Sequence, residues 1–296
     1  MKSRTVKLLY PRMHIKRPAT PIVFLDTFVW HSILSEYRKE RDALDAACHA
    51  GKITVAITSA IEGELKGHGI LDEARALCGD SLISVPIGRI PANQMIHSLL
   101  CFIHKRIHFS LSWDLAISEV PVLRPPIRLK DAATNLVFEL KLARKNYRGP
   151  RKELVAVFVD IERGNWKTTL TPYCDALIEE QQGIDVRSLY DEFFLTDYFT
   201  DLPYIMLGSY FLAYLFRERE LSVQDLVDVF SLSELLPYTS LYVFDKDQHT
   251  RMRRLQRDYG PLFKRVDDAC FISSTLLGST NPKEALRSLL RSLQKE

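Results

Sequence analysis

The chain has 296 residues, of which 46% are hydrophobic and 26% are charged, and its formal net charge is +3. This composition excludes wholesale disorder, and the length suits one large domain or two ordinary ones. Five cysteines without a CxxC pair favour reduced thiols in the cytoplasm over a disulfide framework or a zinc ribbon. No apolar run is long enough for a signal peptide or a membrane span, so we expect no membrane association.

Short apolar runs rich in β-branched residues predict four strands, at residues 22–26, 53–57, 82–85 and 241–245. Residues 27–50 are expected to form a helix after the first strand, and Thr58 and Ser59 offer caps for a helix after the second. Such alternation of strands and helices is typical of a parallel α/β sheet. A last strand at 262–266 and a last helix at 282–294 are also predicted.

Between these two α/β segments, residues 90–221 are mostly helical by pattern. Residues 154–159 could be strand or buried helix, because periodicity does not distinguish the two. We therefore expect a basic N-terminal arm at 1–20, an α/β core at 21–89 and 222–296, and a helical insertion at 90–221 packed on that core. No linker separates the insertion.

Two of the predicted strands end in an aspartate, Asp26 in FLDT and Asp245 in YVFD. Ligands of open parallel sheets bind beyond the carboxyl ends of the strands. Carboxylates brought together there repel unless a cation lies between them, and hard cations prefer oxygen ligands. Asp26 alone is explained equally well as a helix cap.

Two further segments resemble motifs of the PIN-domain nucleases. The string TSAIEGELKG, residues 58–67, is similar to the second PIN motif, with Glu64 as the functional acid and Glu62 one position off the pattern. Residues 222–247, SVQDLVDVFSLSELLPYTSLYVFDKD, resemble the closing segment of a bacterial PIN-like branch, with Asp228 on a helix and Asp245 at a strand end. The resemblance covers residues 21–86 and 203–268.

The resemblance implies a three-layer α/β/α sandwich with a parallel central sheet, Rossmann-like in plan, that carries the large helical insertion. It also implies an endonuclease that uses Mg²⁺ or Mn²⁺ to activate water and cleaves RNA or single-stranded nucleic acid. The expected catalytic and metal-binding residues are Asp26, Glu64, Asp228 and Asp245, with Asp247 as an additional or replacement metal ligand.

Ser240 stands where that branch usually has an acid, so a catalytically weak or inactive PIN-like scaffold is the alternative. In that case the insertion would serve as a surface for a partner. The sequence leaves open whether the chain binds a protein partner or inhibitor and whether it forms a homo-oligomer.

Basic clusters are the expected nucleic-acid contacts, although solvated basic faces explain any one cluster as well. Six basic residues and no acid precede Asp26. The cluster expected to line a nucleic-acid path comprises Arg144, Lys145, Arg148, Arg151 and Lys152. His97, His104 and His108 would share one face of a helix if their segment is helical, either as a polar face or as a phosphate-facing surface with Lys105 and Arg106.

Overall fold

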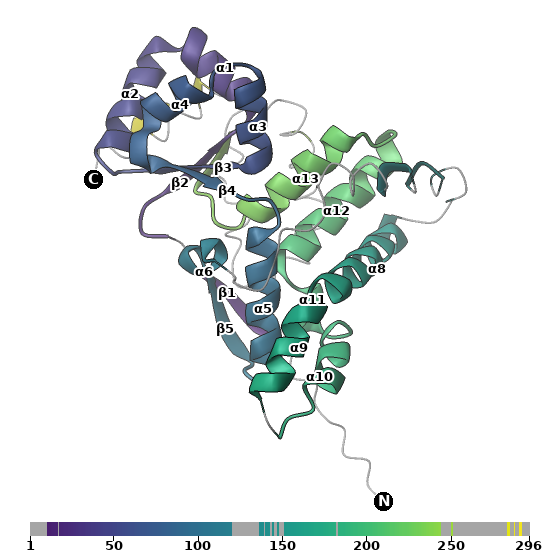
Figure 1. The fold of residues 1–296 in the computed structure, drawn as a ribbon. Coiled ribbons are helices and arrows are strands. Elements are labelled where there is room, and N and C mark those ends of the chain that lie inside the picture. Colours follow the sequence, from purple (N-terminus) through teal and green to yellow (C-terminus); the bar gives the residue numbers. More distant parts are fainter. Residues whose placement is uncertain are drawn as a thin grey trace, which may run out of the picture.

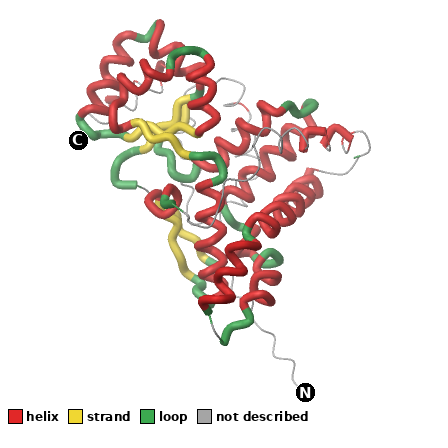
Figure 2. Tube along the Cα trace, in the orientation of Figure 1, coloured by secondary structure: helices red, strands yellow, loops and turns green. Residues whose placement is uncertain are grey.

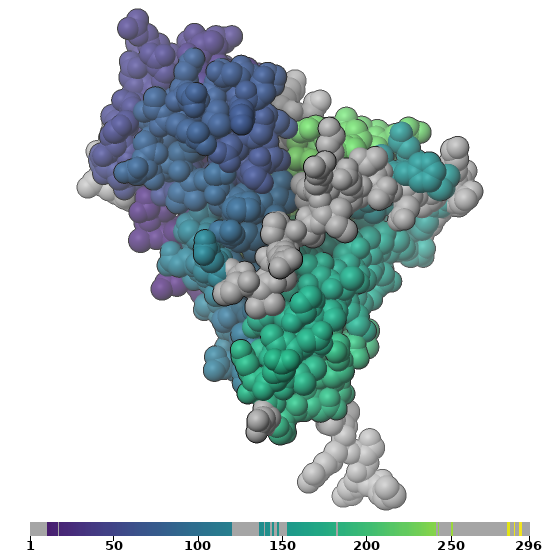
Figure 3. All heavy atoms as spheres, viewed as in Figure 1, coloured from purple at the N-terminus to yellow at the C-terminus, as the bar shows by residue number. Residues whose placement is uncertain are grey.

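The computed structural model describes residues 11–16, 18–119, 151–181 and 183–243. Within the remaining segments it describes residues 136–138, 140–142, 144, 147, 250, 283, 284, 287, 290 and 291. Across these residues the fold is mixed α/β with short parallel sheets, as the sequence predicts. The molecule narrows from the end that carries the larger sheet toward helices α9 and α10 (Figures 1 and 3).

The larger sheet has four parallel strands in the order β4-β3-β2-β6. Its strands are β2 (Ile22–Leu25), β3 (Thr54–Thr58), β4 (Leu82–Val85) and β6 (Leu241–Val243). The chain moves outward from β2 to β4 on one side and returns to the other side of β2 with β6. The connections therefore diverge between β2 and β6, which is the position where open α/β sheets place ligands.

Four helices follow the first strands and gather on one side of this sheet in Figures 1 and 2. They are α1 (Thr27–Ser35), α2 (Arg38–His49), α3 (Ser59–Gly67) and α4 (Leu71–Cys78), and a short 3-10 turn, η1 (Gly79–Ser81), leads into β4. The single helix predicted at 27–50 is wrong. The Ser32 carbonyl accepts both the Glu36 and the Tyr37 N–H groups, and the chain turns at Tyr37 before α2 begins.

A second sheet of two parallel strands joins the N-terminal segment to the middle of the chain. It pairs β1 (Arg12–Lys16) with β5 (His108–Ser112). Residues 90–221 are thus not wholly helical. Their helices are α5 (Arg89–Ile103), α6 (Trp113–Ile117), α8 (Arg151–Thr169), α9 (Thr171–Glu180), α10 (Val186–Phe193), α11 (Asp197–Thr200) and α12 (Pro203–Glu218). The ambiguous residues 154–159 lie within α8.

Two hydrophobic clusters form the interior. One contains the four-stranded sheet, α1–α4, most of α12 and α13 (Val223–Leu235). The other contains most of α5, α9–α11, Met13 of β1, the inner side of β5 and the start of α12. Since α12 contributes to both clusters, it joins the helical region to the α/β region.

The C-terminal residues that are described return to the first helices. Leu290 is buried in the same cluster as the four-stranded sheet, and Arg287 donates to Glu40 of α2 at 2.5 Å. Residues 244–249 and nearly all of 250–282 lie outside the described residues, and so do the last predicted strand and most of the last predicted helix. Within the described part of the chain, no helix is long and apolar enough to cross a membrane.

Candidate carboxylate site

Asp26 lies at the carboxyl end of β2, beside the point where the strand connections diverge. It is also the N-cap of α1, and its Oδ1 accepts the Thr27 N–H at 2.7 Å. The capping role and the position at the sheet edge are therefore compatible. Capping fixes the direction in which the carboxylate leaves the strand, since the same group must face the first turn of α1.

Glu64 reaches Asp26's end of the sheet from α3. Thr58, the last residue of β3, caps this helix, and Ile61 and Leu65 bury its inner side. Glu64 lies half-buried between that side and the solvent. The Thr27 hydroxyl donates a hydrogen bond to Glu64 Oε2. Thr27, the residue after Asp26, thus connects the carboxyl end of β2 to the acid of α3.

Asp228 comes from α13, more than 160 residues after Glu64 in the sequence. A capping box of Ser222 and Asp225 begins this helix, and Arg219 pairs with Asp225. Gln224, one turn before Asp228, donates its side-chain Nε2 to Glu64 Oε1 at 2.7 Å and to Asp228 Oδ1 at 3.0 Å. A single amide nitrogen therefore bridges the carboxylates of two distant helices.

The three acids Asp26, Glu64 and Asp228 form one electrostatic cluster, which we call the carboxylate site. Burial and the nearby carboxylate of Asp26 raise the pKa of Asp228 to about 7, with smaller contributions from Glu64 and Asp225, while the Gln224 hydrogen bond lowers it. The buried Tyr242 of β6 also has its pKa raised, by burial and by the charges of Asp26 and Asp228. Its ring stacks on Phe24 with centroids 4.2 Å apart. The site thus lies above the β2–β6 pair.

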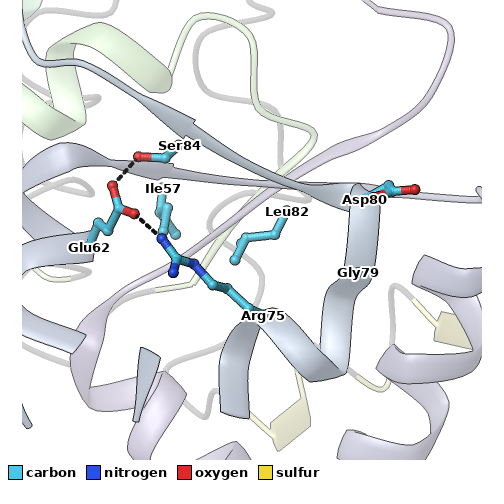
Figure 4. Close-up of a pocket in the computed structure, with 7 residues that line it drawn as sticks. All are labelled: Ile57, Glu62, Arg75, Gly79, Asp80, Leu82 and Ser84. Atoms are coloured by element: carbon cyan, nitrogen blue, oxygen red, sulfur yellow. Dashed lines mark hydrogen bonds and ion pairs between the residues drawn. The ribbon is translucent and has the colours of Figure 1, made fainter. Parts of the chain in front are cut away.

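Glu62, the other acid of the TSAIEGELKG segment, points elsewhere. Figure 4 shows it in a separate hollow at the β4 edge, between Arg75 and Ser84. Arg75 donates to Glu62 Oε1 at 2.7 Å, and the Ser84 hydroxyl donates to Oε2 at 2.6 Å. Glu62 is therefore occupied in an ion pair with α4, whereas Glu64 of the same helix belongs to the carboxylate site.

Several predicted site residues lie outside the described residues, namely Asp245, Asp247, Lys145 and Arg148. The β6 strand pairs Val243 with Leu25, the residue before Asp26. Arg144 is half-buried in a helical segment, and Arg151 and Lys152 begin α8, although their side chains are outside the description.

The three histidines do not share a helical face, because α5 ends at Ile103 and His108 begins β5. Within the described residues, no group of three or more His, Cys, Asp or Glu side chains is arranged to hold a metal ion. The Gln224 amide donates to both Glu64 and Asp228 and so lies between these two acids.

Thr27, Gln224 and Tyr242 belong to the site but are not predicted from the sequence. Gln224 precedes Asp228 by one helical turn, a spacing that places both side chains on one face of α13. That spacing is the one signal that could have identified it. Thr27 and Tyr242 lie beside predicted acids in the sequence or the sheet, but nothing in their sequence positions distinguishes a role at the site from ordinary packing.

Buried polar groups hold α13, the helix that carries Asp228, against neighbouring elements. Ser231 shares a hydrogen bond of 3.0 Å with Thr58, the cap of α3. Glu234 is fully buried, and its Oε1 accepts the Gly88 N–H at 2.8 Å. Burial raises the pKa of Glu234 to about 8, so the group is largely neutral at pH 7. These contacts connect α13 to the starts of both α3 and α5, which restricts the position of Asp228.

Comparisons of the chain with family models, with curated proteins and with solved structures found no match.

Proposed function

We propose that the chain is a metal-dependent endonuclease that hydrolyses RNA or single-stranded nucleic acid, with a PIN-like core in a three-layer α/β/α sandwich. One observation carries the proposal. Asp26, Glu64 and Asp228 come from three separate elements and meet at the diverging connections of a parallel sheet, where Asp228 has a pKa of about 7. Repelling carboxylates destabilise a fold without a ligand, so their convergence points to a cation-binding function.

The donor set suits a hard divalent cation such as Mg²⁺ or Mn²⁺, because all three acids offer carboxylate oxygens. The Gln224 amide donates to Glu64 and Asp228 from a position that a cation would also favour. Asp26, Glu64 and Asp228 would hold the ion once that amide turns aside. When bound, the ion would lower the pKa of a coordinated water and offset charge on the phosphate.

The residues of the chain have distinct roles in this proposal. The Thr27 hydroxyl orients Glu64 through its hydrogen bond, and the capping contact orients Asp26. In the metal-free site the pKa of Asp228 is about 7, so Asp228 would lose its proton when a cation binds and become a carboxylate ligand, and the proton of the attacking water would pass to solvent. The water oxygen bonds to phosphorus as the sugar oxygen leaves with the electrons of the broken P–O bond.

The second candidate is a PIN-like scaffold without catalysis. It is favoured by the Gln224 bridge, which satisfies two of the three acids without a metal. A scaffold would retain this bridge when Mn²⁺ is added, whereas a nuclease would exchange it.

The test is cleavage of generic single-stranded RNA by the purified chain with Mn²⁺ and with EDTA. We expect cleavage with Mn²⁺ alone and its loss, by about a hundredfold or more, in Asp26→Asn and Asp228→Asn. Glu62→Gln is the matched control, because Glu62 lies two residues from Glu64 but pairs with Arg75. Equal activity of Asp228→Asn and Glu62→Gln would refute the nuclease proposal, as would cleavage that persists in EDTA.

A further inference from the structure

The pairing of β1 with β5 brings two basic segments together from positions almost a hundred residues apart. Residues 11–21 and 104–113 contain no acid. In the parallel register, Arg12 lies opposite His108, His14 opposite Ser110, and Lys16 opposite Ser112. We call the side of the sheet that carries these six residues the outer face. Figure 1 shows the two strands side by side, close to α5.

The inner side of the same strands is fully apolar. Met13, Ile15 and Leu111 are no more than 1% exposed, and Phe109 packs against His97 of α5 and Tyr198 of α11. Because side chains alternate along a strand, burial of this side fixes the outer face toward solvent. Arg12, His14, Lys16, His108 and Ser110 are all exposed. The register therefore places Arg12 and Lys16 on the exposed side of β1, with His14 between them.

Two more cations stand at the turn that leads into β5. Lys105 and Arg106 are exposed and follow the end of α5. The Arg106 N–H bonds to the Cys101 carbonyl at 2.8 Å, and the Lys105 N–H bonds to the Phe102 carbonyl at 3.0 Å. This is a Schellman motif in which Lys105 takes the left-handed position with φ of 54°. Glycine is the favoured residue there, so a lysine at this position carries a conformational cost.

Ordinary structural reasons account for part of this pattern. Cations stabilise the carboxyl end of a helix, which suits Lys105 and Arg106, and charged side chains protect exposed strand edges from aggregation. Neither reason accounts for the lack of any acid among residues 11–21 and 104–113. Among the described residues, none of Arg12, Lys16, Lys105 and Arg106 forms a salt bridge. Within the described part of the chain, the charges of these four side chains are thus available to an anionic ligand.

We propose that the outer face of β1 and β5, together with Lys105 and Arg106, binds the phosphodiester backbone of nucleic acid. Outward-facing side chains repeat about every 6.6 Å along a strand, so Arg12 and Lys16 can contact different phosphates of one backbone, and the Ser110 hydroxyl can donate to a phosphate oxygen. The face has no exposed apolar side chain to insert into a bilayer, which favours a nucleic acid over an anionic membrane. Binding by this surface requires no metal and no cleavage.

The experiment measures binding of a labelled single-stranded RNA by fluorescence anisotropy, in EDTA, over a range of salt concentrations. The double variant Arg12→Glu with Lys16→Glu should bind about tenfold more weakly or worse. Its plot of log affinity against log salt should be shallower by about 0.7 for each lost phosphate contact. The matched control is Arg38→Glu with Lys39→Glu, which makes the same change in net charge at exposed positions of α2.

The variant Lys105→Gly distinguishes a loss of binding from a loss of stability, because the two properties should change in opposite directions. It should raise the melting temperature, because glycine relieves the left-handed backbone, and it should weaken binding by several-fold. The proposal is overturned if both double variants bind alike, if Lys105→Gly binds as the parent does, or if vesicles containing phosphatidylserine bind more tightly than RNA. Since EDTA prevents metal-dependent cleavage, the binding measurement does not depend on whether the nuclease proposal is correct.

Discussion

Replacement of Asp228 by asparagine tests whether the carboxylate site stores repulsion in the metal-free protein. Asparagine keeps the shape of the side chain and the oxygen that accepts from Gln224. The pKa of Asp228 is raised from its ordinary 3.8 to about 7. At a pH where the folded carboxylate is ionised, this pKa difference corresponds to a loss of roughly 4 kcal/mol in the free energy of unfolding. Residual solvent at this half-buried group screens the repulsion, so we expect about 2 kcal/mol.

Proton linkage determines how the stability of the parent protein changes with pH. Folded Asp228 holds its proton up to about pH 7, whereas the unfolded chain releases it near pH 3.8. The parent protein therefore loses stability as the pH rises through this range, and the asparagine variant does not. Below about pH 4 the two should be equally stable, and above pH 7 the variant should be more stable by about 2 kcal/mol. Urea unfolding at several pH values without metal measures the difference.

The control is Asp225→Asn in the first turn of the same helix, which breaks the capping box and the pair with Arg219 and should destabilise the protein. A stability difference for Asp228→Asn that does not change with pH would refute the reasoning. Destabilisation at neutral pH would do so as well, since that is the result expected of an acid held in a favourable ion pair.

Three further predictions follow from single contacts. Gln224→Ala removes the amide between Glu64 and Asp228, so the free energy of unfolding of the metal-free protein should fall by about 1 kcal/mol. Mn²⁺ should raise the melting temperature of this variant more than that of the parent. An equal response to Mn²⁺ would contradict the proposed exchange of the amide for a cation. Glu234→Gln should be silent below about pH 4.5 and stabilising above pH 8, because folded Glu234 keeps its proton to about pH 8 and the parent loses stability across that range; urea unfolding against pH tests this. Lys105→Gly should stabilise the protein by about 1 kcal/mol in thermal unfolding, and destabilisation would show that the lysine side chain supports the turn.

The strands of the four-stranded sheet could be predicted because each is a short apolar run with a distinct end. Ile22–Leu25 is buried on both sides, and such strands form continuous hydrophobic sequences. The aspartate after that run marked the carboxyl edge of the sheet. Only the resemblance of two segments to PIN motifs predicts that Asp26, Glu64 and Asp228 lie together, because these acids are far apart in the sequence. The position of Asp245 remains a prediction.

The features missed from the sequence depend on contacts between distant segments. RMHIK and HFSLS alternate polar and apolar residues over five positions, a pattern too short to distinguish from a loop. Their pairing joins positions 12 and 108, and parallel pairing over such a distance leaves no local signal. The break between α1 and α2 depends likewise on one carbonyl that accepts two N–H groups, which no propensity indicates.

The helical region has a direct structural connection to the carboxylate site. Helix α13, which carries Asp228, packs along α12, and the two approach closely where the Cα of Gly208 faces Ser233. Phe230 contacts both hydrophobic clusters and lies near the Tyr204 ring, with centroids 6.4 Å apart. The position of Asp228 relative to Asp26 is therefore set by packing on both sides of α13. The four-stranded sheet and helices α1–α4 are enough to position Asp26 and Glu64. The position of Asp228 depends on contacts with the helical region as well. Packing changes at α12 should for this reason alter the carboxylate site without touching any of its acids.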